Sequence, residues 1–438
     1  MTTIHLQDHT DRVRQAQPFV PRGRIVEVAG LTIQATGPHM SVGDLCYLEH
    51  GNGRERVPVE VVGFRGDRVL LMPLGEMYGI GPGSALIPTF KPRSVRVGSD
   101  LLGRVLGSMG QPIDGRPAPQ WEEEVPLLAA PPNPMTRPLI HEPLATGVRA
   151  IDGCITCGKG QRVGIMAGSG VGKSKLIGMI ARNTNADVNV IALIGERGRE
   201  VREFIEDALG PEGLARSVVV VATSDEPALL RVSGAYTATA VAEWFRGQGA
   251  DVMLIMDSIT RFAMAQREVG LAIGEPPTTR GYPPSVYALL PKLLERAGTD
   301  ASGSITAFYA VLVEADDLND PIGDHVRSIL DGHIALSRGL ASRGHYPAID
   351  VLESISRAMI EVVSPEHRQL AIEIRSVLAT YRDAEDLVNI GAYVQGSNPD
   401  IDRAIRLMPK VRSFLQQDLK VRTEFSTMEA DMIAALKG

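Results

Sequence analysis

The sequence predicts an α/β protein with an antiparallel β domain, a mainly parallel sheet covered by helices, and a helical domain in series. Between about residues 145 and 360, apolar runs such as "RVGIMA" and "DVMLIMD" alternate with helical stretches, which is typical of a parallel sheet with helices on both faces. Before this region, short β-branched runs alternate with glycine turns. After Pro365, apolar residues recur at helical spacing, which indicates a helical end to the chain.

The same patterns divide the chain into segments. Residues 1–20 are polar with scattered apolar positions, and we expect a flexible segment or a short amphipathic helix that docks a partner. Residues 21–95 predict a small barrel or sandwich, because runs such as "GRIVEVAGLTIQATG" end in glycine turns. Residues 96–144 are rich in proline, which fixes extended geometry and indicates a connecting segment. The parallel sheet is expected in 145–360 and the helical domain in 361–438.

The composition is that of a soluble globular protein. The chain has 438 residues, more than one ordinary core holds, of which 44% are hydrophobic and 22% charged. The formal net charge of -7 argues against a protein whose main task is to coat nucleic acid or an anionic membrane. No apolar run approaches the roughly 20 residues that span a bilayer, and the polar N-terminus lacks the apolar centre of a signal peptide. We therefore expect a cytoplasmic protein.

The three cysteines, Cys46, Cys154 and Cys157, predict no disulfide framework. Cys154 and Cys157 form one CxxC pair, which would bind a metal or exchange disulfides given a second pair or a thioredoxin-like context. The sequence shows neither, so we interpret the pair as two small residues in a turn.

A glycine-rich stretch, "MAGSGVGKSKL" at residues 166–176, carries the strongest chemical signal. It follows the strand-like "RVGIMA" and opens a helical stretch, as a phosphate-binding loop does, although Ala167 stands where the GxxxxGK[ST] pattern has its first glycine. A methyl group is tolerable there if the residue keeps an extended conformation at the strand end. The N–H groups of the loop and the positive end of the helix would hold phosphate oxygens. The residues expected to bind the nucleotide are Gly168, Ser169, Gly170, Val171, Gly172, Lys173, Ser174 and Lys175.

Further residues complete the predicted site. Lys173 would reach the β- and γ-phosphates, and the hydroxyl of Ser174 would hold Mg²⁺. Asp257 ends "DVMLIMD", at the edge where open α/β sheets bind ligands, and would bind Mg²⁺ through water. Glu196 ends the run "IALIGE" and would orient the water that attacks the γ-phosphate, with Arg197 beside it to pair with phosphate. Without the loop upstream, either strand end has an ordinary interpretation as a polar turn.

These motifs together resemble a known family. The stretches "AGSGVGKS", "GERGREV", "MDSITRFAMAQREVGLAIGEPPTTRGYPPS" and "DGHIALSRGLASRGHYPAIDVLESISR" are similar to those of type III protein-export ATPases, and most of all to the flagellum-specific members. The resemblance runs from about residue 20 to the C-terminus. It implies the architecture of rotary ATP synthase subunits: a β-barrel, a RecA-like P-loop NTPase domain and a helical C-terminal domain. Family members also have alanine at the position of Ala167.

The resemblance also implies roles for individual residues. Glu196 matches the catalytic glutamate, and Arg261, like Arg197, matches an arginine on the phosphate side. Tyr346 matches the aromatic residue that stacks on adenine, and Arg357 matches an arginine finger donated across a subunit boundary. A flat ring suits a base, and a guanidinium suits the charge of a transferring phosphoryl group. Without the family, Tyr346 would be interpreted as a packed turn residue and Arg357 as a solvated one.

A finger from a neighbouring copy requires a ring of like subunits, and the family implies a homohexamer that binds ATP and Mg²⁺. The implied function is ATP hydrolysis coupled to the delivery or unfolding of export substrates, in peripheral association with a flagellar export gate at the membrane. The implied partners are an export regulator at residues 1–20, a central stalk-like protein at the C-terminal domain near "GSNPDID", and export chaperones and substrates. No nucleic-acid partner is expected.

Other functions stay open at this stage. The same chemistry serves virulence-type injectisomes, and nothing in the chain separates the two machines. A Rho-like RNA translocase shares the core but needs a basic, aromatic-bearing barrel, against which the net charge of -7 and 5% aromatic residues argue. A nucleotide-binding subunit that does not hydrolyse ATP is a further alternative, against which Glu196 argues.

Overall fold

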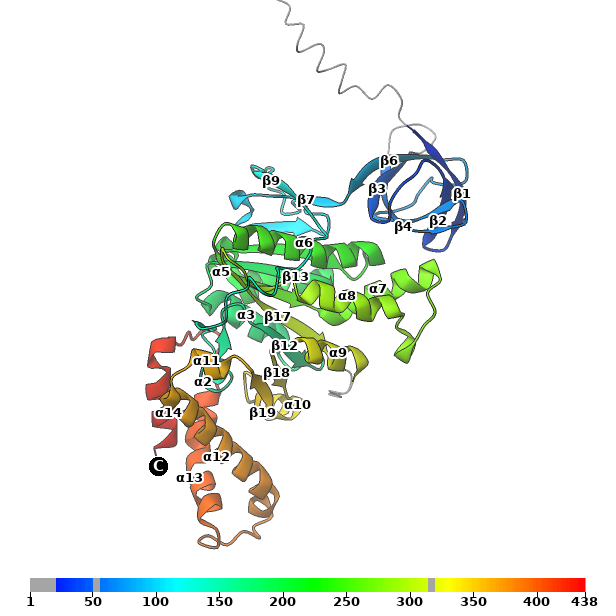
Figure 1. The fold of residues 1–438 in the computed structure, drawn as a ribbon. Helices are drawn as coiled ribbons and strands as arrows, with labels where there is room; N and C mark the ends of the chain where they lie inside the picture. Colours follow the sequence, from blue (N-terminus) through cyan, green and yellow to red (C-terminus); the bar gives the residue numbers. More distant parts are fainter. Residues whose placement is uncertain (1–20, 50–55, 314–319, 438) are drawn as a thin grey trace, which may run out of the picture. The chain divides into compact units, whose positions relative to one another are not determined.

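The computed structural model of the chain describes residues 21–49, 56–313 and 320–437. The chain forms two compact units, and apart from residues 272–274 the first unit ends at Arg93. Figure 1 shows the barrel of the first unit and the helix-covered sheet of the second. Each unit has a hydrophobic core of its own.

The first unit is a closed antiparallel barrel. Its strands are β1 (Gly23–Ala29), β2 (Thr32–Thr36), β3 (Asp44–Glu49), β4 (Arg56–Arg65), β5 (Arg68–Pro73) and β6 (Ala85–Pro92). One face of each strand points inward, and Ile33, Leu48, Val61 and Leu71 are each at most 1% exposed. The strand order is β1-β2-β5-β4-β3-β6, and the pairing of β1 with β6 closes it. This pairing decides between the barrel and the sandwich that the sequence left open.

The second unit is built on a mostly parallel sheet. Its strands are β8 (Arg104–Gly107), β12 (Arg162–Ala167), β13 (Val188–Glu196), β14 (Ser217–Thr223), β15 (Asp251–Asp257), β16 (Gly298–Thr299), β17 (Ser304–Leu312), β18 (Gly332–Leu336) and β19 (Ile349–Ser356). The order is β19-β18-β12-β17-β15-β13-β14-β8, with β16 paired to β17. Neighbours from β18 to β8 run parallel, whereas β19 pairs antiparallel with β18. The apolar runs that predicted the sheet form its central strands.

Helices cover both faces of this sheet. They are α2 (Arg149–Cys154), α3 (Lys173–Asn183), α4 (Gly198–Glu203), α5 (Gly210–Ala215), α6 (Ala228–Gly247), α7 (Ile259–Ile273), α8 (Pro284–Leu294), α9 (Pro321–Ile329), α10 (Arg338–Ser342) and α11 (Met359–Val362). Alternate strand residues, such as Ile165, Ile191 and Val219, join α3 in one apolar cluster. The long helix α6 packs on β13, β14 and β15. Figure 1 shows α6 and α3 on opposite sides of the strands.

The proline-rich stretch 96–144 is more than a connecting segment. It contains β8, which adds an edge strand to the sheet beside β14. Arg104 of β8 donates to both carboxylate oxygens of Asp114, at 2.7 and 2.9 Å. Its start belongs to β7 (Ser94–Val97), which pairs antiparallel with β9 (Glu123–Pro126) farther along the stretch. The expectation of a simple linker failed because the prolines lie outside β8, whose N–H groups stay free to pair.

The C-terminal helices belong to the same compact unit as the sheet. They are α12 (Pro365–Asn389), α13 (Pro399–Leu415) and α14 (Met428–Leu436). Ile374 and Leu407 are buried in the same apolar cluster as Ile151 of α2, so the helical end extends the core of the sheet. The turn "GSNPD" predicted between helices is there, since the side chain of Asn398 accepts from Asp400 N at 2.9 Å and begins α13.

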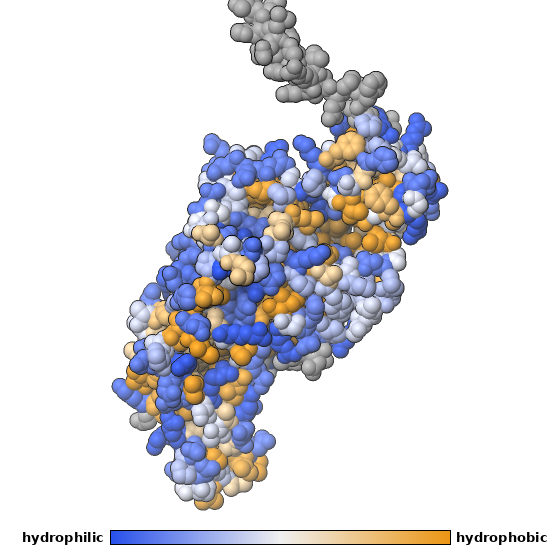
Figure 2. Space-filling view, viewed as in Figure 1, coloured by the Kyte–Doolittle hydropathy of each residue, from blue (hydrophilic) through white to orange (hydrophobic). Residues whose placement is uncertain are grey.

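The surface mixes hydrophilic and apolar residues. Figure 2 shows hydrophilic residues over much of the face in view, separating the apolar residues into groups. Among the described residues, no helix combines the length and the apolar character needed to cross a membrane. The expected N-terminal segment, residues 1–20, and the regulator assigned to it lie outside the described residues.

Candidate active site

The phosphate loop connects β12 to α3 at the carboxyl edge of the sheet. Gly170 and Gly172 have φ angles of 78° and 93°, in the left-handed region that glycine adopts without strain. Gly172 is also the residue from which α3 begins, and the first N–H groups of a helix have no partner within it. The loop therefore presents backbone donors and the positive end of a helix dipole at one place.

Ala167 is accommodated because it belongs to the strand and not to the turn. It pairs with Leu312 of β17 in parallel register, and its carbonyl accepts from Val313 N at 3.1 Å. Its side chain is fully buried in the apolar cluster that includes α3. A residue in extended conformation does not need to be glycine. The departure from the common loop pattern therefore leaves the turn at Gly170 and Gly172 unchanged.

Three residues predicted from separate motifs converge at this edge. The neighbouring parallel strands β13 and β15 end at Glu196 and Asp257. Lys173, the first residue of α3, pairs through its Nζ with Asp257 Oδ1, and this Nζ lies 3.9 Å from Glu196 Oε1. The side chains of Lys173 and Asp257 are 11% and 4% exposed. Electrostatic interactions in such a water-poor place are stronger than in bulk solvent.

Burial makes the carboxyl group of Glu196 a weaker acid than usual. Burial raises the pKa of Glu196 to about 7, the negative charge of Asp257 acts in the same direction, and Lys173 opposes both. A carboxyl group whose pKa lies near the working pH is suited to accept a proton from, or to orient, a reacting water. The pKa of Glu196 therefore fits the role that the sequence predicts for it.

A cleft of about 910 Å³ contains the loop, Lys173 and Glu196 in its walls. Arg197 also lines it, with a side chain that is 82% exposed and lies 3.6 Å from Glu200. Arg261 reaches the cleft by packing over Gly195, where a Cβ would lie 2.9 Å from Arg261 Cβ. Both predicted phosphate-side arginines thus share the cleft with the loop.

Tyr346 lies beside the phosphate loop of its own chain. A Cβ on Gly172 would stand 3.5 Å from Tyr346 Cε1, so the ring borders the end of the loop. The residue is 44% exposed, and its carbonyl accepts from Gln417 N at 3.0 Å. An exposed ring next to a phosphate loop offers a flat apolar surface to a base.

Arg357 lies at the opposite, amino edge of the sheet. It directly follows β19, whose last residue, Ser356, pairs with Gly332 at the start of β18. Its N–H donates to the carbonyl of Asp331 at 3.0 Å. Arg162, the first residue of β12, binds the carboxylate of Asp331 at 3.0 and 3.1 Å. One chain therefore brings Lys173, Glu196 and both predicted phosphate-side arginines to the cleft. Asp257 and Tyr346 lie beside it, next to Lys173 and Gly172, whereas Arg357 lies at the other edge of the sheet.

Three segments of the chain match known protein families. Residues 147–356 match the ATP synthase alpha/beta family, nucleotide-binding domain, and residues 25–89 match its beta-barrel domain. Residues 363–434 match the T3SS EscN ATPase C-terminal domain. The chain is 53% identical to the flagellum-specific ATP synthase of Bacillus subtilis (strain 168) over 431 residues, 98% of either chain. It is 54% identical to the type 3 secretion system ATPase of Xanthomonas euvesicatoria over 395 residues, 90% of this chain and 89% of the relative. The chain belongs to the type III and flagellar export ATPase family.

Solved structures show the same fold. The assembled ATPase EscN from the enteropathogenic E. coli type III secretion system is 46% identical, with a TM-score of 0.90 over 95% of this chain and 100% of that one. EscN in complex with its central stalk EscO is 45% identical, with a TM-score of 0.88 and the same coverage. The present chain is accordingly a nucleotide-binding, ATP-hydrolysing type III export ATPase. The predicted family, fold class and enzyme class are confirmed.

The residues of this export ATPase would fit a magnesium ion bound together with phosphates. Mg²⁺ takes oxygen ligands and is commonly bound by one or two carboxylates plus substrate phosphates. The part of the chain that the structure describes contains no cluster of three or more acidic, histidine or cysteine residues that would hold a metal. Ser174 lines the cleft with a hydroxyl, and Asp257, at 3% exposure, offers a carboxylate beside Lys173. This donor set suits an ion whose remaining ligands are phosphates and water.

Sequence reasoning missed Thr260 and Arg338, which also line the cleft. The hydroxyl of Thr260 accepts from Leu312 N at 2.9 Å and so ties the start of α7 to the end of β17. Arg338 directly follows Ser337, whose side chain caps α10 at the end of β18. The signal was available, because "IALSRG" ends a parallel strand in polar residues just as "IALIGER" does.

A second cavity of about 650 Å³ lies between β19 with α10 and the helices α12 and α13. Its walls carry the ion pairs Arg382–Asp350, at 2.7 Å, and Arg343–Glu385, at 2.6 Å. Phosphate-loop residues are absent from its described lining, so this cavity is separate from the nucleotide cleft.

Proposed function

We propose that this export ATPase works as a homohexameric ring in flagellar protein export, with each ATP site completed by a neighbouring copy. The observation that carries the proposal is the position of Arg357 at the sheet edge opposite to Lys173 and Glu196. The strand β12 alone spans roughly 17 Å between the two edges, at about 3.3 Å per residue. An arginine side chain does not bridge that length, so a role at the phosphates requires the site of another copy. The relative EscN has been solved as an assembled ATPase, which supports a ring.

The proposed reaction uses groups that are already in place. Phosphates would bind the loop between β12 and α3, and Lys173 would turn from Asp257 to the β- and γ-phosphates. Glu196, as a carboxylate, would orient the attacking water in line with the bond that breaks. Mg²⁺, held by Ser174 and by Asp257 through water, would neutralise phosphate charge. Arg357 of the neighbouring copy would stabilise the charge that spreads over the transferring phosphoryl group.

The other assignments follow the same geometry. Tyr346 would stack on adenine, because its ring borders Gly172 at the end of the loop. Arg197 and Arg261 would pair with phosphate oxygens, since both line the cleft. The C-terminal helices are proposed to contact a central stalk-like protein at the turn before α13, by analogy with the EscN–EscO complex. Export chaperones and substrates, an export regulator and the membrane export gate are the further proposed partners.

A substitution at Glu196 tests the catalytic part of this proposal. Glu196→Gln keeps the size of the side chain but removes the carboxylate, and we expect ATP turnover to fall about 10²- to 10⁴-fold with nucleotide binding retained. Glu203→Gln is the matched control, because Glu203 lies on α4 and pairs with Arg199 away from the loop. Turnover at the wild-type rate in Glu196→Gln would overturn the assignment.

Subunit mixing tests the shared site. Arg357→Ala alone should lower turnover about 10³-fold or more while nucleotide binding stays nearly intact. Mixing it with Glu196→Gln creates interfaces that combine the intact Glu196 of one copy with the intact Arg357 of the other, so turnover should return in part. Arg368→Ala, on the exposed side of α12, is the control for loss of a surface arginine. Failure of the mixture to regain turnover would contradict a finger supplied by a neighbour.

A separate comparison and a separate experiment concern the choice between a flagellar machine and an injectisome. The flagellum-specific relative of Bacillus subtilis matches 98% of this chain, against 90% for the secretion relative of Xanthomonas euvesicatoria, although the identities are similar. Deletion of the gene should abolish swimming and leave effector secretion unchanged. A normally motile deletion strain that fails to secrete effectors would assign the chain to an injectisome.

A further inference from the structure

At the amino edge of the sheet, a buried glutamine, Gln161, donates to the side chain of Ser356, the residue before Arg357. We propose that Gln161 is a positioning residue that fixes the backbone from which Arg357 projects toward a neighbouring copy. The inference rests on the proposed function of Arg357 as a finger, and it adds a residue that lies outside the lining of the nucleotide cleft. Gln161 immediately precedes β12, the strand that leads to the phosphate loop.

The side-chain amide of Gln161 is fully buried, and both its oxygen and its nitrogen form hydrogen bonds. The residue is 0% exposed. Its Oε1 accepts from Gly158 N at 2.9 Å, and its Nε2 donates to the carbonyl of Asp331 and to Ser356 Oγ, each at 3.0 Å. A buried polar group costs free energy unless it is hydrogen-bonded, and a satisfied one specifies a single arrangement of its neighbours. Here the neighbours are the two segments that meet at Arg357.

The same two segments hold the backbone of Arg357. The carbonyl of Asp331 accepts from Gln161 Nε2 and also from Arg357 N, both at 3.0 Å. The hydroxyl of Ser356 accepts from Gln161 and donates to the carbonyl of Thr156 at 2.7 Å. Ser356, the residue before Arg357, is thus bonded to Gln161 itself, and the N–H of Arg357 is bonded to a carbonyl that Gln161 also binds.

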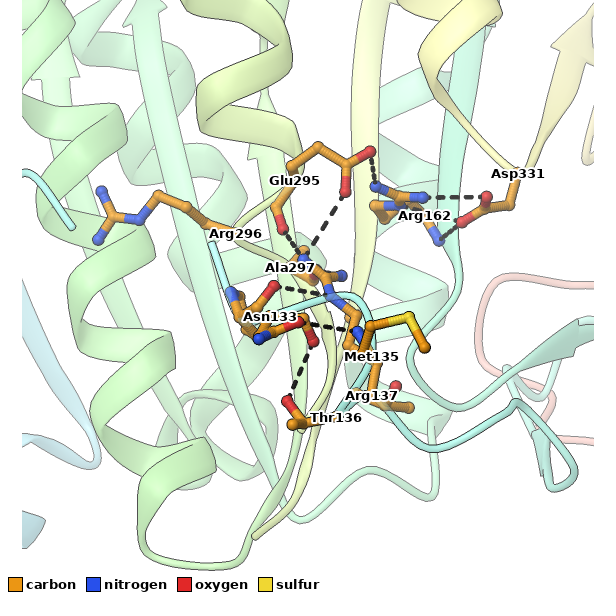
Figure 3. A network of polar contacts seen from close by, with 12 residues as sticks. Asn133, Met135, Thr136, Arg137, Arg162, Glu295, Arg296, Ala297 and Asp331 are labelled. Carbon is orange, nitrogen blue, oxygen red and sulfur yellow. Dashed lines mark hydrogen bonds and ion pairs between the residues drawn. The ribbon is translucent and has the colours of Figure 1, made fainter. Parts of the chain in front are cut away.

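The side chain of Asp331 is also held by ion pairs and hydrogen bonds (Figure 3). Arg162 donates to both oxygens of the Asp331 carboxylate, at 3.0 and 3.1 Å, and also pairs with Glu295. Glu295 lies 3.7 Å from Arg137, whose guanidinium donates to the carbonyl of Ala297 at 3.0 Å. The carbonyl that accepts from Arg357 therefore belongs to a residue whose own side chain is held from the opposite side.

A close backbone approach completes the arrangement. A Cβ on Gly332 would lie 2.4 Å from the carbonyl oxygen of Ile355, so β18 and β19 meet there with no room for a side chain. The side chain of Arg357 is exposed, and among the described residues no acidic group forms an ion pair with it. The described residues thus fix the backbone of this arginine and leave its exposed guanidinium without an acidic partner among them. That division is what a finger supplied to another copy requires.

Substitution of Gln161 tests the inference. In Gln161→Leu, turnover at saturating ATP should fall about 10- to 100-fold, because a small displacement of a catalytic group costs about that much. Binding of a fluorescent ATP analogue should not change, since the phosphate loop is intact. Gln266→Leu, at a buried glutamine of α7, is the matched control. Ser356→Ala removes the other end of the bond and carries the same expectation if Gln161→Leu does not fold.

A double substitution and subunit mixing separate positioning from general damage. If Gln161 acts through Arg357, Gln161→Leu should cause no further loss in the Arg357→Ala background, and its mixture with Glu196→Gln should regain turnover. Wild-type turnover of Gln161→Leu, or an undiminished loss in the Arg357→Ala background, would overturn the inference. The mixture of Arg357→Ala with Glu196→Gln reports on the finger independently of Gln161, so failure of the proposed function is distinguishable from failure of this inference.

Discussion

The two edges of the central sheet are built differently. At the carboxyl edge, the first N–H groups of α3 and the hydroxyl of Ser174 face a cleft of about 910 Å³. At the amino edge, Gln161, Arg162 and Asp331 use their polar groups on one another and on nearby backbone. An edge that receives a charged ligand needs donors that the fold does not use, whereas an edge that holds a geometry needs donors that are all paired. The difference indicates a binding edge and a supporting edge within one chain.

The electrostatics follow the same division. At the carboxyl edge, Lys173 is the one cation within 4 Å of both Glu196 and Asp257 among the ion pairs of the described residues. At the amino edge, Arg162 stands between the carboxylates of Asp331 and Glu295. In the proposed mechanism the first arrangement changes when phosphates bind, because Lys173 would exchange the carboxylate of Asp257 for a phosphate oxygen. The second neutralises its charges within the fold.

A substitution at the carboxyl edge should have an effect as large as that of Arg357→Ala. Lys173→Ala should lower ATP turnover on the order of 10³-fold or more, because it removes the cation that meets the phosphates and leaves the buried Asp257 without its partner. Turnover and the affinity for a fluorescent ATP analogue would both be measured. Lys292→Ala, at an exposed position of α8, is the matched control and should change neither. If Lys173→Ala left turnover unchanged, the carboxyl edge could no longer be distinguished from the amino edge as the edge that binds the nucleotide.

A pH profile should give the next largest effect. The raised pKa of Glu196, about 7, means that its carboxyl group gains a proton as the pH falls through neutrality. In the proposed mechanism the carboxylate form orients water, so kcat/KM should fall from about pH 8 to about pH 6, approaching tenfold per pH unit at the acid end. Activity that rises on acidification would contradict the sign of this argument. In Glu196→Gln, the residual activity should no longer fall between about pH 8 and about pH 6, because the carboxyl group that gains the proton is absent.

The smallest effect is expected at the cysteines. Burial raises the pKa of the Cys154 thiol to about 12 and that of the Cys46 thiol to about 11, and it also raises the pKa of Cys157. Thiolates are the reactive form, so native protein should resist iodoacetamide near neutral pH and should react at all three positions once unfolded. Labelling followed by mass spectrometry checks this. Rapid labelling of Cys157 in the native state would show that the segment just before the amino edge opens.

Much of the fold was predictable because its signals are local. The alternation of apolar runs with helical stretches predicted the parallel sheet, and glycine turns between short strands predicted the first β domain. Two points were not local. The choice of barrel over sandwich depends on the pairing of Gly23 and Arg24 with Leu86 and Ala85, far apart in the chain. The strand at Arg104 was hidden in a proline-rich stretch, because its partner β14 lies more than a hundred residues away.

The residues of the candidate site also differ in how far the sequence alone could identify them. Lys173, Glu196 and Asp257 were predicted from motifs, because Lys173 follows a recognisable strand and the two carboxylates each end one. Parallel strands gather their carboxyl ends at one edge, which is why the three lie together, and their roles in the reaction stay proposals. Thr260 and Arg338 were missed, although polar residues at strand ends are visible in the sequence. The assignments of Tyr346 and Arg357 came from family resemblance and stay proposals.

The sequence by itself determined the chemistry: a glycine loop before a helix, a lysine, and carboxylates at strand ends specify phosphate binding and hydrolysis through short-range spacing. Tertiary structure alone decided where the remaining groups act. It accommodated Ala167 by placing it in β12, it put Arg357 at the edge opposite to the loop, and it joined Gln161 to Asp331 and Ser356 across separations of 170 and 195 residues. The physical reason is that hydrogen bonds between distant segments form only after the sheet has set its strand order, and no local pattern records that order.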